Sequence, residues 1–91
     1  MALFALICRD KPGHLQMRLD TRTAHLAYIE ETGVVAQAGP FLDAAGEMCG
    51  SLVILDVFDH AAATSWAEGD PYARAGLFES VSIQAWKRVI G

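Results

Sequence analysis

The order of strand-like and helix-like segments is the feature that most limits the fold of this chain. Two dense apolar runs, residues 2–8 and 52–55, predict strands, because short apolar runs bounded by polar residues are typical of buried strands. The apolar positions between them recur at helical spacing, at Leu15, Leu19, Leu26 and Ile29. Strand and helix therefore alternate from the start of the chain.

Turn and capping residues set the expected limits of each element. Gly33 follows a helix, where a left-handed cap favours glycine, and Asp59 can cap the start of a second helix. Pro40 donates no backbone hydrogen bond and predicts an edge strand or a bulge. Asp70 before Pro71 can open a short extra helical turn. The expected strands are residues 2–9, 34–42, 48–57 and 79–89, and the expected helices are residues 14–32 and 59–68.

This β-α-β-β-α-β order predicts a ferredoxin-like α+β fold in a single domain, residues 1–91. Four antiparallel strands would carry two helices on one face and leave the other face bare. Hydrophobic residues make up 53% of the chain, which exceeds the need of one small core. Because large exposed apolar patches are disfavoured, we expect two copies to pair as a dimeric α+β barrel.

The charge pattern excludes several classes of partner. The net charge is −4 and the seven basic residues form no run, so we expect no nucleic-acid binding. The apolar run at residues 2–8 is much shorter than a membrane span and lacks a basic leader, so we expect neither a membrane partner nor a signal peptide. A cytoplasmic protein is the prediction.

Metal and cofactor sites are not predicted. Cys8 and Cys49 show no CxxC spacing and are expected to be buried thiols. His14 and His25 would lie about 16 Å apart on a helix, too far to share one ion. No glycine pattern for a phosphate-bearing cofactor is present.

His25 is the side chain best suited to chemistry. It lies mid-helix, three residues after Arg22, so the two should share a helix face beside the apolar positions. Imidazole titrates near neutral pH, and a carboxylate on one ring nitrogen would fix its tautomer. Asp70 can supply that carboxylate if its loop approaches the first helix. Two plainer roles remain open: a structural histidine at His25 and a simple helix cap at Asp70.

Several short motifs occur together in one order along almost the whole chain. They are the N-terminal apolar strand, Arg22-x-x-His25-Leu26-x-Tyr28, Gly39-Pro40, Gly50-Ser51, Asp70-Pro71-Tyr72 and Ala75-Gly76-Leu77. In this combination the chain resembles the YciI-like family. The resemblance implies a ferredoxin-like dimeric barrel with a pocket centred on a His–Asp pair, here His25 and Asp70. A degradation enzyme of that family eliminates chloride from a chlorinated hydroxyquinol, which implies lyase-type chemistry.

We therefore expect a small-molecule enzyme in which His25, oriented by Asp70, removes a proton from a small aromatic or enolisable substrate. Arg22 would stabilise the oxyanion. Ser51 and Tyr72 would bind substrate oxygens, and the expected pocket walls are Phe41, Trp66 and Phe78. One alternative is a dimeric module that binds a small ligand without turnover. Another is an isomerase or cofactor-free oxygenase of the wider dimeric α+β barrel group.

Overall fold

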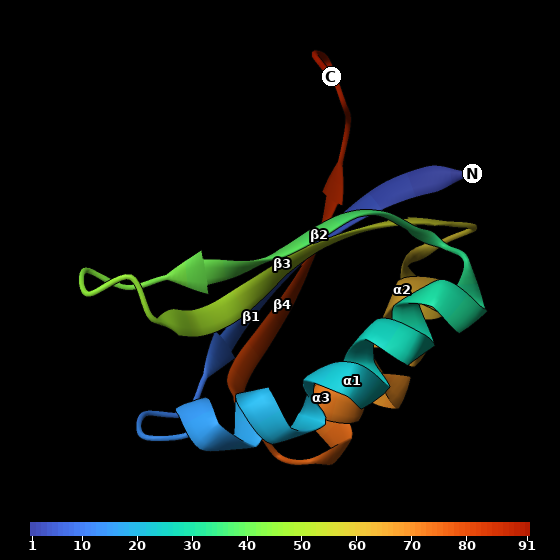
Figure 1. Ribbon diagram of the computed structural model, residues 1–91. Coiled ribbons are helices and arrows are strands. Elements are labelled where there is room, and N and C mark those ends of the chain that lie inside the picture. The colour runs from blue at the N-terminus through green and yellow to red at the C-terminus, as the bar shows by residue number, and fades with distance from the viewer.

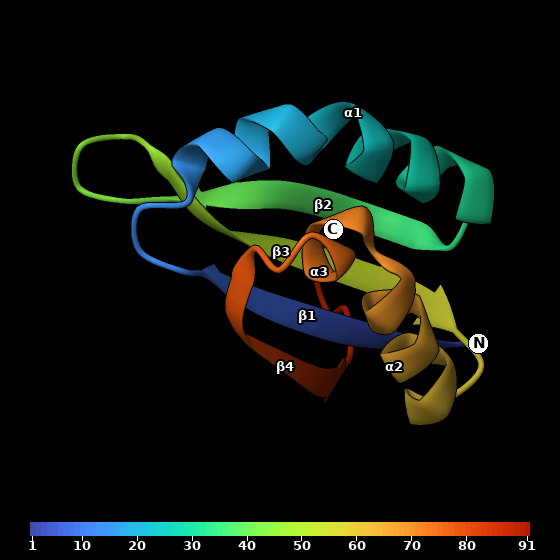
Figure 2. The ribbon, with the colours of Figure 1, turned by 90° about the horizontal axis from the view of Figure 1, so that it is seen from below.

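The computed structural model describes all residues, 1–91, and its layers are a sheet and a set of helices on one of its faces (Figures 1 and 2). The strands are β1 (Ala2–Asp10), β2 (Val35–Leu42), β3 (Met48–Val57) and β4 (Phe78–Trp86). The helices are α1 (Leu15–Thr32), α2 (His60–Gly69) and the short α3 (Pro71–Arg74). All strand pairs are antiparallel, in the order β2-β3-β1-β4. The predicted ferredoxin-like α+β fold is thus confirmed.

The expected C-terminal end of the last strand was wrong. We expected residues 79–89, whereas β4 is Phe78–Trp86. The reason lies in its partner strand: Trp86 pairs with Leu3, and β1 itself begins at Ala2. Beyond Trp86 the strand has almost no neighbouring backbone left to bond. The last residues therefore leave the sheet, although Val89 and Ile90 are apolar.

The capping residues act as predicted. Gly33 adopts φ 65° and its N–H donates to the carbonyl of Ile29 at 3.3 Å, which closes α1 in the left-handed conformation that glycine favours. The Asp59 side chain accepts from the N–H of Ala62 and starts α2. Pro40 lies in β2, which is an edge strand. Local chemistry therefore fixes most element boundaries.

The core lies between the sheet and the helices. Alternate side chains of β1 and β3 point toward the helices and pack against two residues of α2. The cluster consists of Phe4, Leu6, Cys8, Val53, Leu55, Val57, Ala63 and Trp66. Cys8 is a buried thiol, as expected, whereas Cys49 is only partly buried; neither forms a disulfide.

Helix α1 buries a polar face, contrary to the simplest amphipathic pattern. Its two buried residues are Arg18 and His25, while Leu19 and Leu26 are each 46% exposed. Leu19 and Leu26, two of the apolar positions at helical spacing, therefore do not form the buried face of the helix. A helix that turns an arginine and an imidazole toward the sheet needs buried polar partners for them.

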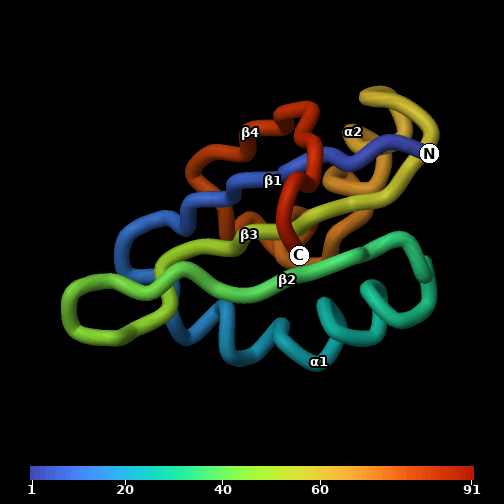
Figure 3. Tube along the Cα trace, turned by 90° about the horizontal axis from the view of Figure 1, so that it is seen from above, coloured from blue at the N-terminus to red at the C-terminus, as the bar shows by residue number.

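The opposite face of the sheet carries no helix (Figures 1 and 3). Leu52 and Trp86 pair with Ile7 and Leu3 on this open face and are 36% and 40% exposed. The C-terminal segment leaves β4 on the same side (Figure 1). No helix in the chain has both the length and the apolar character needed to cross a membrane.

Candidate functional site

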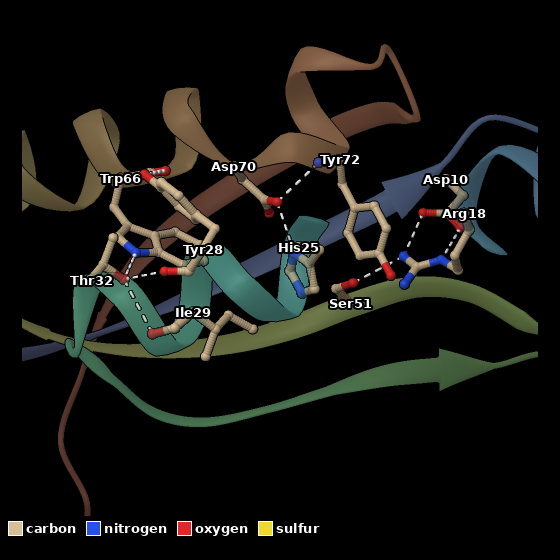
Figure 4. Close-up of polar contacts among 10 residues, drawn as sticks. All are labelled: Asp10, Arg18, His25, Tyr28, Ile29, Thr32, Ser51, Trp66, Asp70 and Tyr72. Atoms are coloured by element: carbon tan, nitrogen blue, oxygen red, sulfur yellow. Dashed lines mark hydrogen bonds and ion pairs between the residues drawn. The ribbon is translucent and has the colours of Figure 1, made fainter. Parts of the chain in front are cut away.

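His25 and Asp70 meet in the structure although 45 residues separate them. The ring Nδ1 of His25 lies 2.8 Å from Oδ1 of Asp70 (Figure 4). Helix α1 supplies the histidine, and the junction between α2 and α3 supplies the carboxylate. The two residues are 6% and 2% exposed, so water competes little for this contact.

Asp70 also caps helix α3, as the sequence predicted. The oxygen that contacts His25, Oδ1, accepts the backbone N–H of Tyr72 at 3.0 Å. The plain capping role and the pairing with His25 therefore hold at once. Because the backbone of α3 fixes the carboxylate, His25 meets an acceptor that is already in place.

The contact leaves the other ring nitrogen of His25 available. A carboxylate only accepts hydrogen bonds, so we assign the proton to Nδ1 and a lone pair to Nε2. Nε2 bonds no protein atom. Because every fully buried side-chain nitrogen or oxygen in the chain has a partner, Nε2 is not fully buried. Since His25 lines a cavity, Nε2 can accept a proton from a molecule bound there.

Tyr72 lies between His25 and Arg18 (Figure 4). Its ring stacks on the imidazole with centroids 4.0 Å apart and planes at 20°, and the Arg18 guanidinium carbon lies 4.6 Å from its centroid. With both neighbours in place, the hydroxyl is the part of Tyr72 suited to reach a ligand. Burial raises the pKa of Tyr72, although the charges of Arg18 and Arg22 oppose the rise. The hydroxyl therefore remains a donor at neutral pH.

Arg18 is a site residue that the sequence analysis missed. Its Nε and Nη2 donate to the two carboxylate oxygens of Asp10 at 2.7 and 2.8 Å, and Nη2 also donates to Ser51 Oγ at 2.9 Å. Burial alone would lower the pKa of Arg18, but the hydrogen bond and charge of Asp10 outweigh it and raise that pKa. A permanent, fixed cation thus lies beside Ser51.

A sequence signal for Arg18 exists in retrospect. Arg18, Arg22 and His25 follow the spacing i, i+4, i+7 and so share one helix face. The partner Asp10 had no comparable signal. It comes from the end of β1, where the register with β4 shifts between Arg9 and Asp10. Only the folded chain brings it to α1.

A cavity of about 160 Å³ opens between α1 and the β2–β3 side of the sheet. A dry cavity of about 150 Å³ is known to hold benzene, so this one matches a single substituted ring. Four of the site residues expected from the sequence line the cavity: Arg22, His25, Ser51 and Tyr72. Arg18 lines it as well. The larger apolar lining residues are Leu26, Ile29, Pro40, Met48 and Val53.

The expected aromatic walls do not line this cavity. Trp66 belongs to the core, and Phe41 lies under the Arg9 guanidinium at 4.6 Å, on the open face. Phe78 packs edge-on against Tyr72 with centroids 6.0 Å apart. Aliphatic residues form the wall instead, because β2 and β3 turn Pro40, Met48 and Val53 toward α1.

Arg22 contributes a charge that no carboxylate neutralises. The ion pairs of the chain are Arg18–Asp10 and His25–Asp70, so Arg22 has no acidic partner within ion-pair distance. It is exposed and lines the cavity. An anion that formed in the cavity would meet this guanidinium without displacing another contact.

The chain resembles several solved structures. The first, 5-chloro-2-hydroxyhydroquinone dehydrochlorinase (TftG) from Burkholderia phenoliruptrix in complex with 2,5-dihydroxybenzoquinone, matches with a TM-score of 0.87 and 36% identity over 94% of each chain. The second is an antibiotic biosynthesis monooxygenase with a TM-score of 0.62, which covers 99% of this chain and 100% of that one. At 12% identity it shows a common fold only.

Sequence relatives cover almost the whole chain. Protein YciI of Escherichia coli O6:H1 is 36% identical, over 96% of this chain and 98% of that protein. An uncharacterised protein of Haemophilus influenzae is 30% identical, over 94% of this chain and 97% of that protein. The model of the YCII-related domain matches residues 2–87. The chain therefore belongs to the YCII-related family.

Proposed function

We propose that the chain is a small-molecule enzyme in which His25 acts as a general base. The observation that carries this proposal is the buried 2.8 Å contact of Nδ1 with Asp70, which leaves Nε2 free on a residue that lines a ring-sized cavity. Asp70 holds the tautomer and stabilises the imidazolium that forms when Nε2 takes a proton.

The remaining lining residues suit the anion left behind. When Nε2 removes a proton from an acidic O–H or C–H group, the substrate retains the electron pair and becomes an enolate or phenolate. Arg22, which lacks a carboxylate partner, stabilises that charge. The hydroxyl groups of Ser51 and Tyr72 position the substrate oxygens.

Elimination is the reaction that we favour. The electron pair released by deprotonation forms a new double bond and expels a leaving group with its bonding electrons. His25 holds the proton, so the net loss is H–X. This choice rests on the name of the dehydrochlorinase, which is 36% identical to the chain over 94% of its length.

Chloride release from 5-chloro-2-hydroxyhydroquinone tests the reaction. We expect release by the wild-type protein and its loss in His25→Gln, with an unchanged circular dichroism spectrum and a melting temperature close to wild type. Equal release by both proteins would overturn the role of His25. Wild-type protein that binds the compound but forms no product over hours would favour the ligand-binding module, and oxygen uptake would indicate an oxygenase.

We also propose that the whole chain acts as one domain that pairs with a second copy across the open face of the sheet. Only 17 of the 91 residues are buried in one copy, although 53% of the chain is hydrophobic. Leu52 and Trp86 on that face, and Val89 and Ile90 in the segment that follows β4, remain exposed. The two free cysteines fit a cytoplasmic location, where thiols stay reduced.

A further inference from the structure

A tyrosine of α1 contacts α2 immediately beside Asp70. Tyr28 lies three residues after His25, and its hydroxyl donates to the carbonyl of Trp66 at 2.9 Å. Its ring also packs against the Trp66 indole, with centroids 4.9 Å apart. This contact joins the helix that carries His25 to the last turn of the helix that leads into Asp70 (Figure 4).

Thr32 closes this contact into a ring of hydrogen bonds. The Trp66 indole N–H donates to Thr32 Oγ1 at 2.9 Å, and Thr32 Oγ1 donates to the carbonyl of Tyr28 at 2.9 Å. The Tyr28 hydroxyl and the Trp66 indole N–H therefore both have a hydrogen-bond partner at the interface between the two helices. Thr32 thus links the Tyr28 backbone to the Trp66 indole, whereas the Tyr28 hydroxyl itself bonds the Trp66 carbonyl.

The backbone conformation of Gly69 does not explain why a glycine, which is a poor helix former, occupies this position. Gly69 is the last residue of α2 and is not among the glycines with positive φ. Alanine is favoured over glycine by about 1 kcal/mol in a helix interior, and this preference is weaker at a helix end such as Gly69. However, a methyl group on Gly69 would overlap the Tyr28 hydroxyl. Glycine thus leaves room for the tyrosine, whose hydroxyl passes close to the backbone at this point.

We propose that Tyr28 and Gly69 are positioning residues that set the distance between His25 and Asp70. Asp70 follows Gly69 directly, and His25 lies about one helical turn from Tyr28. Any change in the approach of Tyr28 to Gly69 moves the carboxylate relative to the imidazole. The inference rests on the proposed function for its catalytic meaning, whereas the geometry it describes can be measured without turnover.

Nitrogen-15 NMR of the His25 ring, at a pH where the imidazole is neutral, reports that geometry. We expect the wild type to hold the proton on Nδ1. Gly69→Ala should lose most of this tautomer, because the added methyl displaces the loop that carries Asp70. Tyr28→Phe should lose part of it, since only the hydroxyl is removed. The double variant should be closer to Tyr28→Phe than to Gly69→Ala, because the hydroxyl is the atom nearest the methyl and the ring carbon Cζ, at 3.2 Å, needs only a small shift.

Thr32→Val is the matched control. It breaks the bond of Thr32 to Trp66 but keeps the contact between Tyr28 and Gly69, so it should lower the melting temperature and leave the His25 tautomer unchanged. His14 and His60, which lie outside the site, serve as internal references in every spectrum.

Two results would overturn the proposal. One is a wild-type tautomer in both Gly69→Ala and Tyr28→Phe; if Gly69→Ala does not fold, Tyr28→Phe and the double variant decide. The other is a double variant as altered as Gly69→Ala, which would show that the methyl does not act through the hydroxyl. If His25→Gln retains chloride release, the proposed function fails, but the tautomer measurement still decides the role of Tyr28 and Gly69.

Discussion

At the scale of single residues, Asp70 caps a helix and holds an imidazole with the same oxygen atom. Asp70→Asn separates these two roles, because asparagine is as good a cap as aspartate but carries no charge. We expect chloride release to fall by roughly 10²- to 10⁴-fold, as it does when a buried carboxylate no longer fixes its histidine. The melting temperature should change little. An unchanged rate would remove Asp70 from the mechanism.

The buried thiol of Cys8 should make the free energy of unfolding depend on pH in the alkaline range. Burial raises the pKa of its thiol from 9.0 to about 12, with the Asp70 charge as a smaller cause. The unfolded thiol ionises first, so the stability that Cys8 contributes is intact below pH 9 and is lost as pH rises toward 12. The expected loss is about 1.4 kcal/mol per pH unit in that window.

Urea unfolding of wild type and Cys8→Ala between pH 8 and pH 10.5 checks this slope. The alkaline decline should be shallower in Cys8→Ala, whatever the variant costs at pH 8. Cys49→Ala, at a partly buried position, is the control and should keep the wild-type slope. Identical slopes in all three proteins would contradict the prediction.

At the residue level, the sequence is most informative where one helix face holds the information. Arg22 and His25 share a face of α1, and both line the cavity. The pairing of His25 with Asp70 spans 45 residues. The chemistry of the two side chains suggested it and the family resemblance implied it, but no periodicity encodes it. Arg18 was missed because its partner Asp10 comes from another element. Its burial depends on a contact that no local pattern encodes.

At the scale of elements, the Arg18–Asp10 pair ties the end of β1 to the first turns of α1. Both side chains are almost fully buried, at 3% and 7% exposure. Asp10→Ala would leave the guanidinium buried and unpaired, so we expect a loss of about 3–5 kcal/mol in the free energy of unfolding. Urea denaturation measures it.

Asp20→Ala is the matched control for Asp10→Ala. Asp20 lies on the exposed side of α1 and accepts from Gln16 at 2.8 Å. Its loss should change the free energy of unfolding by at most about 0.5 kcal/mol. Equal losses in the two variants would show that the Arg18–Asp10 pair does not anchor α1.

Element boundaries were predictable where a capping residue defines them. Gly33 ends α1 in the left-handed conformation that glycine favours, and the Asp59 side chain caps the start of α2. The end of β4 was not predictable in this way. Its limit is set by the start of β1, whereas the composition of residues 87–90 is compatible with a longer strand.

At the scale of the whole molecule, the open face of the sheet is exposed in a single copy and would be covered in the proposed dimer. Leu52 lies on β3 on this face and is 36% exposed in a single copy. Leu52→Glu would bury a carboxylate in the proposed interface, which is costly without a partner. We expect a dimeric wild type and a monomeric variant by sedimentation velocity. Leu19→Glu, on the exposed side of α1, should stay dimeric.

The central claim is that Nε2 of His25 faces the substrate. A crystal structure of the protein with 2,5-dihydroxybenzoquinone, the molecule bound in the dehydrochlorinase structure, tests it most directly. We predict a ligand oxygen or ring carbon next to Nε2, with an oxygen at hydrogen-bond distance, about 2.6–3.2 Å, and another ligand oxygen directed toward Arg22. A ligand bound outside this cavity, or one that leaves Nε2 turned away from it, would contradict the claim.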